Sequence, residues 1–455
     1  MSLTCVDHNS TITDGADQTC AATAAPESSG PATAATIPPS TPDAPTPDAP
    51  LTPDAPLTPD APLTPDAPLT PDGGPSLRTW LAVFSLALGA AMIVTSEFIP
   101  VGFLPNVATG LHVSLGTAGL MVLVPGLSAA VAAPLVIVGA GRLDRRRMIV
   151  VLGLLVAVSN LLASVAPTFS VVLLARVFLG IAIGGFWGVV PPLGFRLAGA
   201  RAGTRATSVI LAGLSAGTVV GLPAGQLLGN LIGWRATFAG AAGAAILIVA
   251  AQRVLLPRIP SSGGMRFTHL ATVFRVPIAR TALIAGAVVT VGQFSASTFI
   301  TPFLLQKANL ASDLATVVLL GYGLAGIAGT LLGSGLVARS RIWTFVGAAV
   351  AFGAVLVLLP ALRDAPVVVG VLFVVWGLIW GLVPLALQTQ MLTATPDAPE
   401  ASAAVLMSVL QLAIAVGSAL GGVLVDSAGL SLVFIAGGII AVVAGLFGSA
   451  ARHGI

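Results

Sequence analysis

The segment TSEFIPVGFLP, residues 95–105, lies in the second half of an apolar run that begins near Trp80. It contains Glu97, the only acidic residue inside any apolar run of the chain. A carboxylate in hydrocarbon is costly, so such a residue is by default a candidate functional group. Because desolvation disfavours the charged form of a carboxyl group, Glu97 is expected to exchange a proton near neutral pH. The alternative is a structural role, in which Glu97 pairs with an intramembrane arginine and holds helices together.

The composition of the chain excludes an ordinary soluble globular protein. Of its 455 residues, 56% are hydrophobic and 8% are charged, whereas charged residues make up about 25% of soluble domains. A run of about 20 apolar residues can cross the hydrocarbon core of a bilayer as a helix. Twelve such runs predict an all-α membrane protein. The predicted spans are 79–103, 115–138, 148–166, 169–194, 207–231, 236–252, 281–304, 314–336, 343–361, 366–388, 403–425 and 430–450.

These spans divide the chain into four parts. Residues 1–76 form a tail rich in Pro, Thr, Asp and Ala, which is expected to be disordered because it cannot bury a core. Residues 77–252 form a first six-helix bundle, 253–280 a central cytoplasmic loop, and 281–455 a second six-helix bundle.

A weak internal repeat relates the two predicted bundles. Gly217-x-x-x-Gly221 recurs as Gly417-x-x-x-Gly421. Glu97-Phe98-Ile99 resembles Thr298-Phe299-Ile300. Such parallel repeats are found in transporters built from two similar halves. Because the second half has Thr298 in place of Glu97, proton chemistry is expected in the first half only.

The distribution of basic residues predicts the topology. With the N-terminus inside, the outside loops hold only Arg235, Lys307 and Arg363, and Arg176 lies within the fourth span. Every other basic residue falls in an inside loop or tail, which follows the positive-inside rule. An even number of spans then puts both termini in the cytoplasm. Since these charges lie mostly in short loops between spans, the pI near 9.5 does not indicate binding to a nucleic acid polymer.

Glycines recur every fourth residue along the fifth span and form a ridge without side chains. Ridges of small residues let helices approach closely. Tight packing alone would account for the pattern; the alternative is a smooth surface on which helices slide as a carrier changes state. The residues of this predicted conformational element are Gly213, Gly217, Gly221, Pro223 and Gly225.

The spans hold no recognisable catalytic motif. Residues 213–217, GLSAG, fit the nucleophile-elbow pattern, but that motif needs a strand–turn–helix setting, and all histidines lie outside the spans. The only lysine, Lys307, follows Gln306, so there is no Walker A motif. Cys5 and Cys20 precede the first span and leave no thiolate metal site there. We therefore expect no enzyme activity, no cofactor and no metal.

Arg176 is expected at a depth similar to that of Glu97. A cation at that depth needs a partner or a water-filled cavity. Either the two residues form an ion pair, or they share a cavity and compete for protons and substrate.

Other polar and aromatic residues in the spans are candidates for a substrate pocket near the middle of the membrane. A site for planar solutes would combine aromatic faces with a few amide donors and acceptors. For any single aromatic residue, core packing or lipid contact is the alternative. The candidates are Asn160, Trp187, Gln293, Phe294, Tyr322, Trp376, Trp380, Gln388 and Gln411.

These features resemble those of the major facilitator superfamily, in its branch of twelve-helix drug:proton antiporters. Asp144-Arg145-Arg146-Arg147 is similar to the loop motif of that superfamily, which implies a latch between the cytoplasmic ends of helices. Residues 176–180, RVFLG, are similar to the fourth-helix motif associated with proton transfer. Residues 213–225 resemble the antiporter motif of the fifth helix, which implies a role in conformational change.

Within that branch, three segments are similar to those of purine ribonucleoside exporters. They are residues 184–187, GGFW, residues 292–294, GQF, and residues 376–378, WGL. The resemblance implies export of nucleosides such as inosine or guanosine in exchange for protons. Sugar and multidrug exporters of the branch carry nearly the same motifs and remain alternatives.

The sequence therefore predicts a proton-coupled secondary carrier of the cytoplasmic membrane that works by alternating access as a monomer. Its expected partners are a small-molecule substrate, protons and the lipid bilayer. An alternative from a different class is a non-transporting membrane sensor or scaffold that uses the acidic tail. Deletion of residues 1–75 distinguishes the two, because only a scaffold is expected to need the tail.

Overall fold

The computed structural model of the chain describes residues 76–139, 143–190, 193–260, 272–396 and 399–450, all within the compact unit Thr70–Ile455. Twelve of the described helices are long and apolar enough to cross a membrane, which confirms the predicted all-α membrane class. The predicted tail lies outside the described residues except for Ser76, whose hydroxyl caps the first helix.

The helices alternate with short connections along the chain. They are α1 Leu77–Gly102, α2 Leu104–Gly110, α3 Leu115–Gly139, α4 Arg145–Ser164, α5 Phe169–Val189, α6 Leu193–Leu231, α7 Trp234–Leu255, α9 Pro277–Ser297, α10 Ile300–Pro302, the π-helical turn η1 Phe303–Lys307, α11 Ser312–Arg339, α12 Arg341–Ala361, α13 Pro366–Ala394, α14 Pro399–Ala428 and α15 Leu430–Ala450.

Two predicted boundaries differ from the structure for local reasons. The seventh predicted span, 281–304, is wrong as one continuous helix, since α9 ends at Ser297 and the chain continues through α10 and η1. Pro302 has no N–H to bond the carbonyl of Thr298, so an α-helix cannot run undisturbed through this point. The helix of the fifth span begins earlier than predicted and is broken at Gly199, where φ is 70°.

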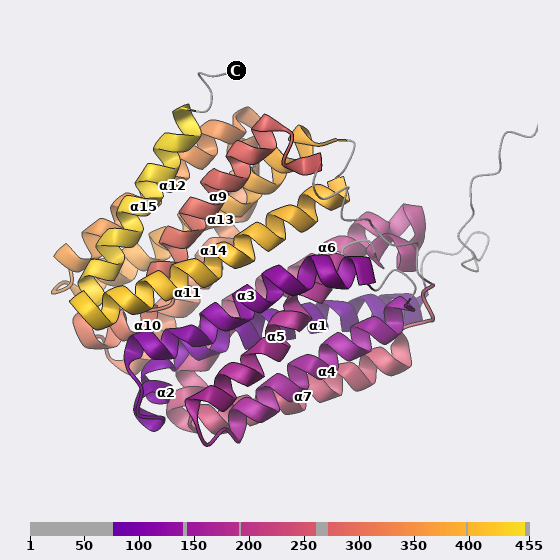
Figure 1. The fold of residues 1–455 in the computed structure, drawn as a ribbon, viewed down its shortest axis with the longest axis horizontal. Coiled ribbons are helices and arrows are strands. Elements are labelled where there is room, and N and C mark those ends of the chain that lie inside the picture. The colour runs from indigo at the N-terminus through magenta and orange to yellow at the C-terminus, as the bar shows by residue number, and fades with distance from the viewer. Residues whose placement is uncertain (1–75, 140–142, 191–192, 261–271, 397–398, 451–455) are drawn as a thin grey trace, which may run out of the picture. The chain divides into compact units, whose positions relative to one another are not determined.

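The described helices form two bundles, α1–α7 and α9–α15, which lie side by side (Figure 1). Helices α3 and α14 pack together along the boundary, and α6 packs on α11. In the first turns of α3, the carbonyl of Gly119 accepts a hydrogen bond of 2.8 Å from Ser418 Oγ on α14.

The two bundles are hydrogen-bonded at one end of this boundary, here called the closed end. Asp426, in the last turn of α14, accepts hydrogen bonds from Ser114 Oγ at 2.5 Å and from the Gly116 N–H at 2.8 Å, where α3 begins. On the other side, Ser312 at the start of α11 accepts a bond of 3.2 Å from Gln226 on α6. In the sequence-based topology this end faces outside.

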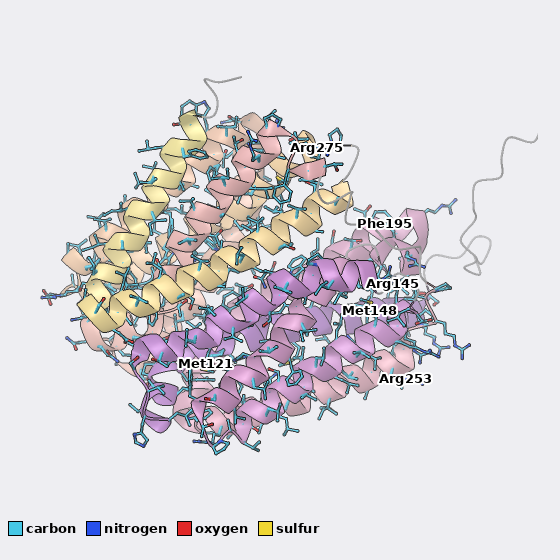
Figure 2. All side chains as sticks on the ribbon, viewed as in Figure 1. Met121, Arg145, Met148, Phe195, Arg253 and Arg275 are labelled. Carbon is cyan, nitrogen blue, oxygen red and sulfur yellow. The ribbon has the colours of Figure 1, made fainter. Side chains whose placement is uncertain are left out.

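The opposite end carries most of the described basic residues. Arg145 and Arg253 lie there, away from Met121 on α3 (Figure 2). Among the described residues, the hydrogen bonds that join the bundles all lie between the middle of the boundary and the closed end. In the described part of the chain, the hydrogen bonds between the bundles are therefore confined to this half of the boundary.

The glycine ridge of α6 packs on α1, inside the first bundle. A Cβ atom built on Gly217 would lie 2.5 Å from the Ala91 carbonyl oxygen, and one on Gly225 would lie 2.2 Å from the Ile99 carbonyl oxygen. Both distances are too short for a real side chain, so only glycine permits this approach. The ridge thus brings α6 against the part of α1 that carries Glu97.

The second bundle repeats this packing. A Cβ on Gly417 of α14 would lie 2.6 Å from the carbonyl oxygen of Val291 on α9. Gly233 and Gly429 precede α7 and α15 with φ of 83° and 86°, a region that favours glycine. The internal repeat seen in the sequence therefore corresponds to the same local geometry in both bundles.

We predict that Gly225→Ala destabilises the protein by about 1–3 kcal/mol, the usual penalty for inserting atoms into a closely packed contact. Gly240→Ala on α7 is the matched control, because no atom lies within 4 Å of its Cβ, and alanine favours a helix over glycine by about 1 kcal/mol. Thermal unfolding in detergent measures both. Equal effects of the two substitutions would contradict the packing role of the ridge.

Candidate functional site

Glu97 lies on α1 at the boundary between the two bundles. Its side chain is 8% exposed, and its Oε1 accepts a long hydrogen bond of 3.5 Å from Nε2 of Gln411 on α14. The other acidic residues described within the candidate spans are terminal, with Asp313 in the first turn of α11 and Asp426 in the last turn of α14. Glu97 is thus the only acidic residue described in the interior of a span.

Arg176 on α5 is fully buried, and α1 supplies its hydrogen-bond partner. Pro100 has no N–H, so the carbonyl of Ser96, four residues earlier, has no helical donor. Arg176 Nη1 donates to this carbonyl at 2.8 Å. Its guanidinium carbon also lies 5.0 Å from the centre of the Phe238 ring, within the range of a cation–π contact. A proline three residues after Glu97 therefore creates the acceptor that Arg176 uses.

The ion pair considered for Glu97 and Arg176 is not formed. Within the described ranges, the one salt bridge shorter than 4.0 Å joins Arg363 and Asp364. Consecutive side chains on a helix point about 100° apart. Because the Ser96 hydroxyl accepts a bond of 2.8 Å from Asn160 Nδ2 inside the first bundle, Glu97 can face α14. The carboxyl group is consequently buried without a direct ion-pair contact to Arg176, and the shared-cavity alternative stays a prediction.

Three aromatic residues connect the bundles close to Glu97 and form what we call the aromatic wall: Phe98, Phe294 and Trp380. The rings of Phe98 on α1 and Phe294 on α9 stack with centres 6.2 Å apart. Trp380 on α13 meets Phe294 edge to face at 6.5 Å. Phe98 and Trp380 are only partly buried. The wall therefore offers apolar faces from both halves beside the carboxyl group.

Behind the wall, three of the predicted substrate-binding residues hydrogen-bond to one another. Gln293 Nε2 donates to the Tyr322 hydroxyl at 2.9 Å, and Trp376 Nε1 donates to Gln293 Oε1 at 2.8 Å. All three are buried, and Trp376 is fully so. This network fixes the inside of the second bundle, so direct contact between Trp376 and a substrate is not supported in this conformation.

Two other predicted residues lie apart from this cluster. Trp187 on α5 packs with the core of the first bundle and meets Phe186 edge to face at 6.2 Å. In the described part of the chain, no ring contact joins Trp187 to the aromatic wall. Gln388 is exposed on α13. Of the predicted polar residues, Gln411 is the one that reaches Glu97.

The predicted loop motif makes contacts within the first half. The Asp144 carboxylate caps α4 by accepting the N–H of Arg146 at 2.8 Å. The Arg146 guanidinium donates to the Arg253 carbonyl, and the Arg145 N–H donates to the Ile259 carbonyl at 2.9 Å. These bonds tie α4 to the last turn of α7 and to the segment that follows it. The latch implied by the family resemblance stays a prediction for another conformation.

Sequence reasoning did not assign a role to Ser96 or Phe98, although both lie in the segment that carries Glu97. A signal for Ser96 was present, because a carbonyl four residues before a proline inside a helix needs another donor. No comparable signal identifies Phe98, since its role depends on Phe294 of the other bundle.

We predict that the effects of Arg176→Met and Pro100→Ala on stability are coupled by about 1 kcal/mol, the scale of one buried hydrogen bond. In the Pro100→Ala background the new N–H can bond the Ser96 carbonyl, so loss of the arginine leaves no unpaired acceptor. A double-mutant cycle by thermal unfolding measures the coupling. Strict additivity would show that the Ser96 carbonyl is not the link between the two residues.

The sequence of this chain is similar to those of known membrane transporters. Residues 86–413 match the model of the Major Facilitator Superfamily. The purine ribonucleoside efflux pump NepI of Escherichia coli O6:K15:H31 (strain 536 / UPEC) is 32% identical over 352 residues, which cover 77% of this chain and 89% of that protein. Its counterpart in Shigella sonnei (strain Ss046) is 33% identical over the same length.

A solved structure shares the fold. It is a bacterial homologue of the human lysosomal transporter Spinster, crystallised in an inward-facing and unoccupied conformation. Its TM-score is 0.69 at 15% identity, with 84% of this chain and 98% of that chain covered. With the family model matching most of the twelve-helix body, the chain belongs to the Major Facilitator Superfamily of membrane transporters.

Proposed function

We propose that this chain is a proton-coupled exporter of small molecules, with purine ribonucleosides as the preferred substrates and Glu97 as the proton carrier. The observation that carries the proposal is the Glu97 carboxyl group, buried at the boundary of the bundles and, among the described residues, not in an ion pair shorter than 4.0 Å. A carboxyl group in such a place is sensitive to any change in hydration. Movement of one bundle relative to the other changes its surroundings directly.

Gln411 is suited to both protonation states of Glu97. Its amide has a donor, Nε2, and an acceptor, Oε1. The donor can bond a carboxylate, as the contact of 3.5 Å indicates, and the acceptor can bond a protonated carboxyl group. Since Gln411 belongs to the second bundle, uptake or release of the proton alters a contact between the halves.

The support for a nucleoside substrate comes from the aromatic wall and from the relatives. A purine base is planar and apolar on its faces, so it can stack on partly buried rings such as Phe98 and Trp380. Amide and hydroxyl groups nearby, above all Gln411, supply hydrogen bonds for its polar edge. The relatives named as purine ribonucleoside efflux pumps favour this substrate class over sugars and cationic drugs.

Alternating access is proposed to use the closed end as one gate. The contacts of Asp426 with α3 hold this end together, and their loss is required before the bundles separate there. With both termini in the cytoplasm, as the basic loops predict, the closed end faces outside. The described conformation then corresponds to a carrier that is shut toward the exterior, and one chain contains both halves of the site.

We predict that Glu97→Gln abolishes substrate accumulation driven by a pH gradient in inverted membrane vesicles, because glutamine cannot carry a proton. Exchange of labelled for unlabelled inosine in the absence of a gradient is expected to continue, since glutamine keeps the size and polarity of the side chain. Asp364→Asn, which neutralises an exposed carboxylate, serves as the control. Gradient-driven accumulation by the Glu97→Gln variant would remove Glu97 from the mechanism.

The same vesicles test the substrate class. Unlabelled guanosine is expected to compete with labelled inosine, whereas a hexose and a cationic drug are not. Competition by the hexose or the drug, without any by guanosine, would replace the nucleoside proposal with the corresponding alternative.

We predict that Asp426→Asn raises the ratio of open to closed conformations at the closed end about tenfold, because a charge-assisted hydrogen bond becomes a neutral one. The reporter is a cysteine at the buried position Ala118, in a chain with Cys5 and Cys20 replaced by serine. The rate of labelling by a membrane-impermeant maleimide measures opening.

Ser427→Ala is the matched control for this experiment. The Ser427 hydroxyl bonds only within α14, so its loss leaves the contacts between the bundles intact. Equal labelling rates in the Asp426→Asn and Ser427→Ala variants would contradict a gating role for Asp426.

A further inference from the structure

A crevice lies inside the second bundle, away from the boundary with the first. Helices α9, α12, α13 and α15 surround it, and its volume is about 350 Å³. Its inner part is apolar, with Ala282, Ala285, Phe345 and Leu387, of which all four are buried. Toward the end that carries the basic loops it is lined by Arg341 and Gln390.

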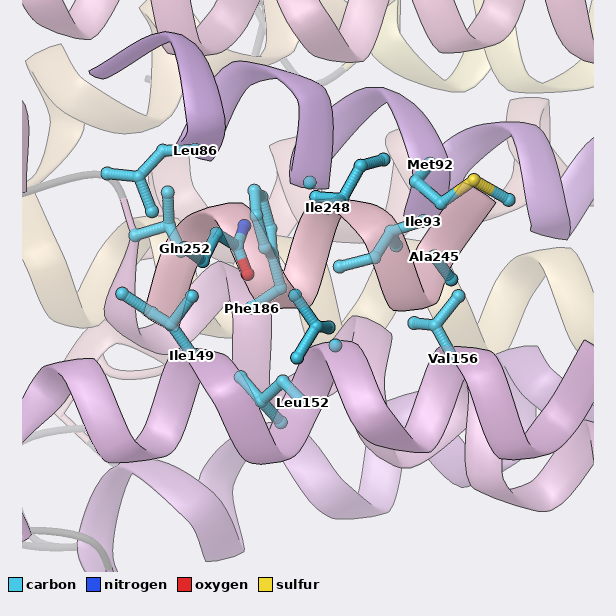
Figure 3. A pocket seen from close by; sticks show the side chains of 14 residues that line it. Leu86, Met92, Ile93, Ile149, Leu152, Val156, Phe186, Ala245, Ile248 and Gln252 are labelled. Carbon is cyan, nitrogen blue, oxygen red and sulfur yellow. The ribbon is translucent and has the colours of Figure 1, made fainter. Parts of the chain in front are cut away.

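The first bundle has a pocket in the corresponding place, but there it is almost filled. Helices α1, α4, α5 and α7 surround it, with Leu86, Ile149, Phe186 and Gln252 among its lining residues (Figure 3). Only about 20 Å³ remain, which is room for about one water molecule. The two pockets are related by the internal repeat, so their difference in volume needs a local cause.

The cause is the size of the lining side chains. In the first bundle they include Leu86, Ile149 and Phe186. The crevice of the second bundle has small residues in its lining, among them Ala282, Ala285 and Gly448. In the described part of the second bundle, the crevice keeps its larger volume.

The mouth of the crevice favours an anion. Arg341 is the first residue of α12, and within the described ranges its guanidinium makes no hydrogen bond or ion pair. Ser340 caps α12 by accepting the N–H groups of Trp343 and Thr344. The N–H groups of Arg341 and Ile342 remain at the helix N-terminus, which carries partial positive charge. The hydroxyl of Thr281 and the amide of Gln390 add polar groups beside the arginine.

We propose that this crevice binds one anionic phospholipid, with its phosphate at Arg341 and an acyl chain along Ala285, Phe345 and Leu387. A positive mouth above an apolar interior matches an amphiphile with an anionic head. Basic pockets between transmembrane helices on the cytoplasmic side are known to accept anionic lipid head groups. A free anion would use the mouth alone and leave the apolar interior exposed.

The test uses the purified full chain and phosphatidylglycerol with a photoreactive group near the end of one acyl chain. Crosslinks mapped by mass spectrometry are expected on peptides that contain Ala285 or Phe345. Arg341→Gln is expected to lower the crosslinking yield about fivefold, because one surface arginine contributes about 1 kcal/mol to the binding of an anionic lipid.

Two controls decide the outcome. Arg339→Gln removes an exposed arginine at the end of α11 that does not line the crevice, and the yield is expected to be unchanged. Phosphatidylcholine with the same photoreactive chain is expected to give little crosslinking. An equal loss with both arginine variants, equal crosslinking by phosphatidylcholine, or crosslinks confined to the outer surface would each overturn the proposal.

A free-anion site is a separate outcome of the same experiment. Inorganic phosphate at millimolar concentration is expected not to displace the lipid, because it cannot use the apolar interior. Displacement by phosphate would show that Arg341 holds a free anion. Displacement by inosine would show that the crevice belongs to the transport path. Either result would contradict a structural lipid site.

Discussion

The hydrogen bond from Arg176 to the Ser96 carbonyl is the contact on which the proposed proton site depends. A buried guanidinium group would normally attract the nearest carboxylate and hold it in an ion pair. Here Pro100 leaves a backbone carbonyl without a donor, and Arg176 bonds to that carbonyl at 2.8 Å. Glu97 therefore makes no direct ion pair with Arg176. One proline thus separates the roles of two ionisable side chains that lie on neighbouring helices.

The two bundles share the same helix packing but differ in the residues that they contribute to the proposed proton site. The glycines of α6 and α14 make the same close approaches to α1 and α9. At the position of Glu97 the second bundle has Thr298, whose hydroxyl bonds back to the Phe294 carbonyl at 2.7 Å. The second bundle instead contributes Gln411 and most of the aromatic wall. The residues of the candidate site thus come from both bundles, so a movement of one bundle relative to the other changes the distances between them.

The helical architecture could be predicted from the sequence because a bilayer restricts which secondary structures a spanning segment can form. Backbone groups must find partners within each span, so the long apolar runs predict helices wherever they occur. The ends of the helices follow less directly from hydrophobicity, because a helix can extend beyond its apolar run into polar residues, as α4 does where it begins at Arg145. The break after Ser297 was missed, since a proline inside a transmembrane helix is often tolerated.

The site was predictable in part. Glu97, Arg176 and Gln411 stand out in the sequence because polar groups are rare in hydrocarbon. Their partners could not be assigned, since Gln411 lies more than 300 residues from Glu97 and nothing local links the two. The crossing of α1 and α14 decided that contact, and the packing of α5 against α1 decided that Arg176 meets a carbonyl rather than a carboxylate.

The number of spans, the repeat and the presence of one acidic residue deep in the predicted spans follow from the amino-acid sequence, because each depends on hydrophobicity or local backbone chemistry. The packing of the helices, which the sequence does not reveal, sets which polar groups meet, which end of the boundary is closed and which aromatic rings from the two bundles touch. Those features depend on the angles and distances between helices, which arise from side-chain packing over the whole body.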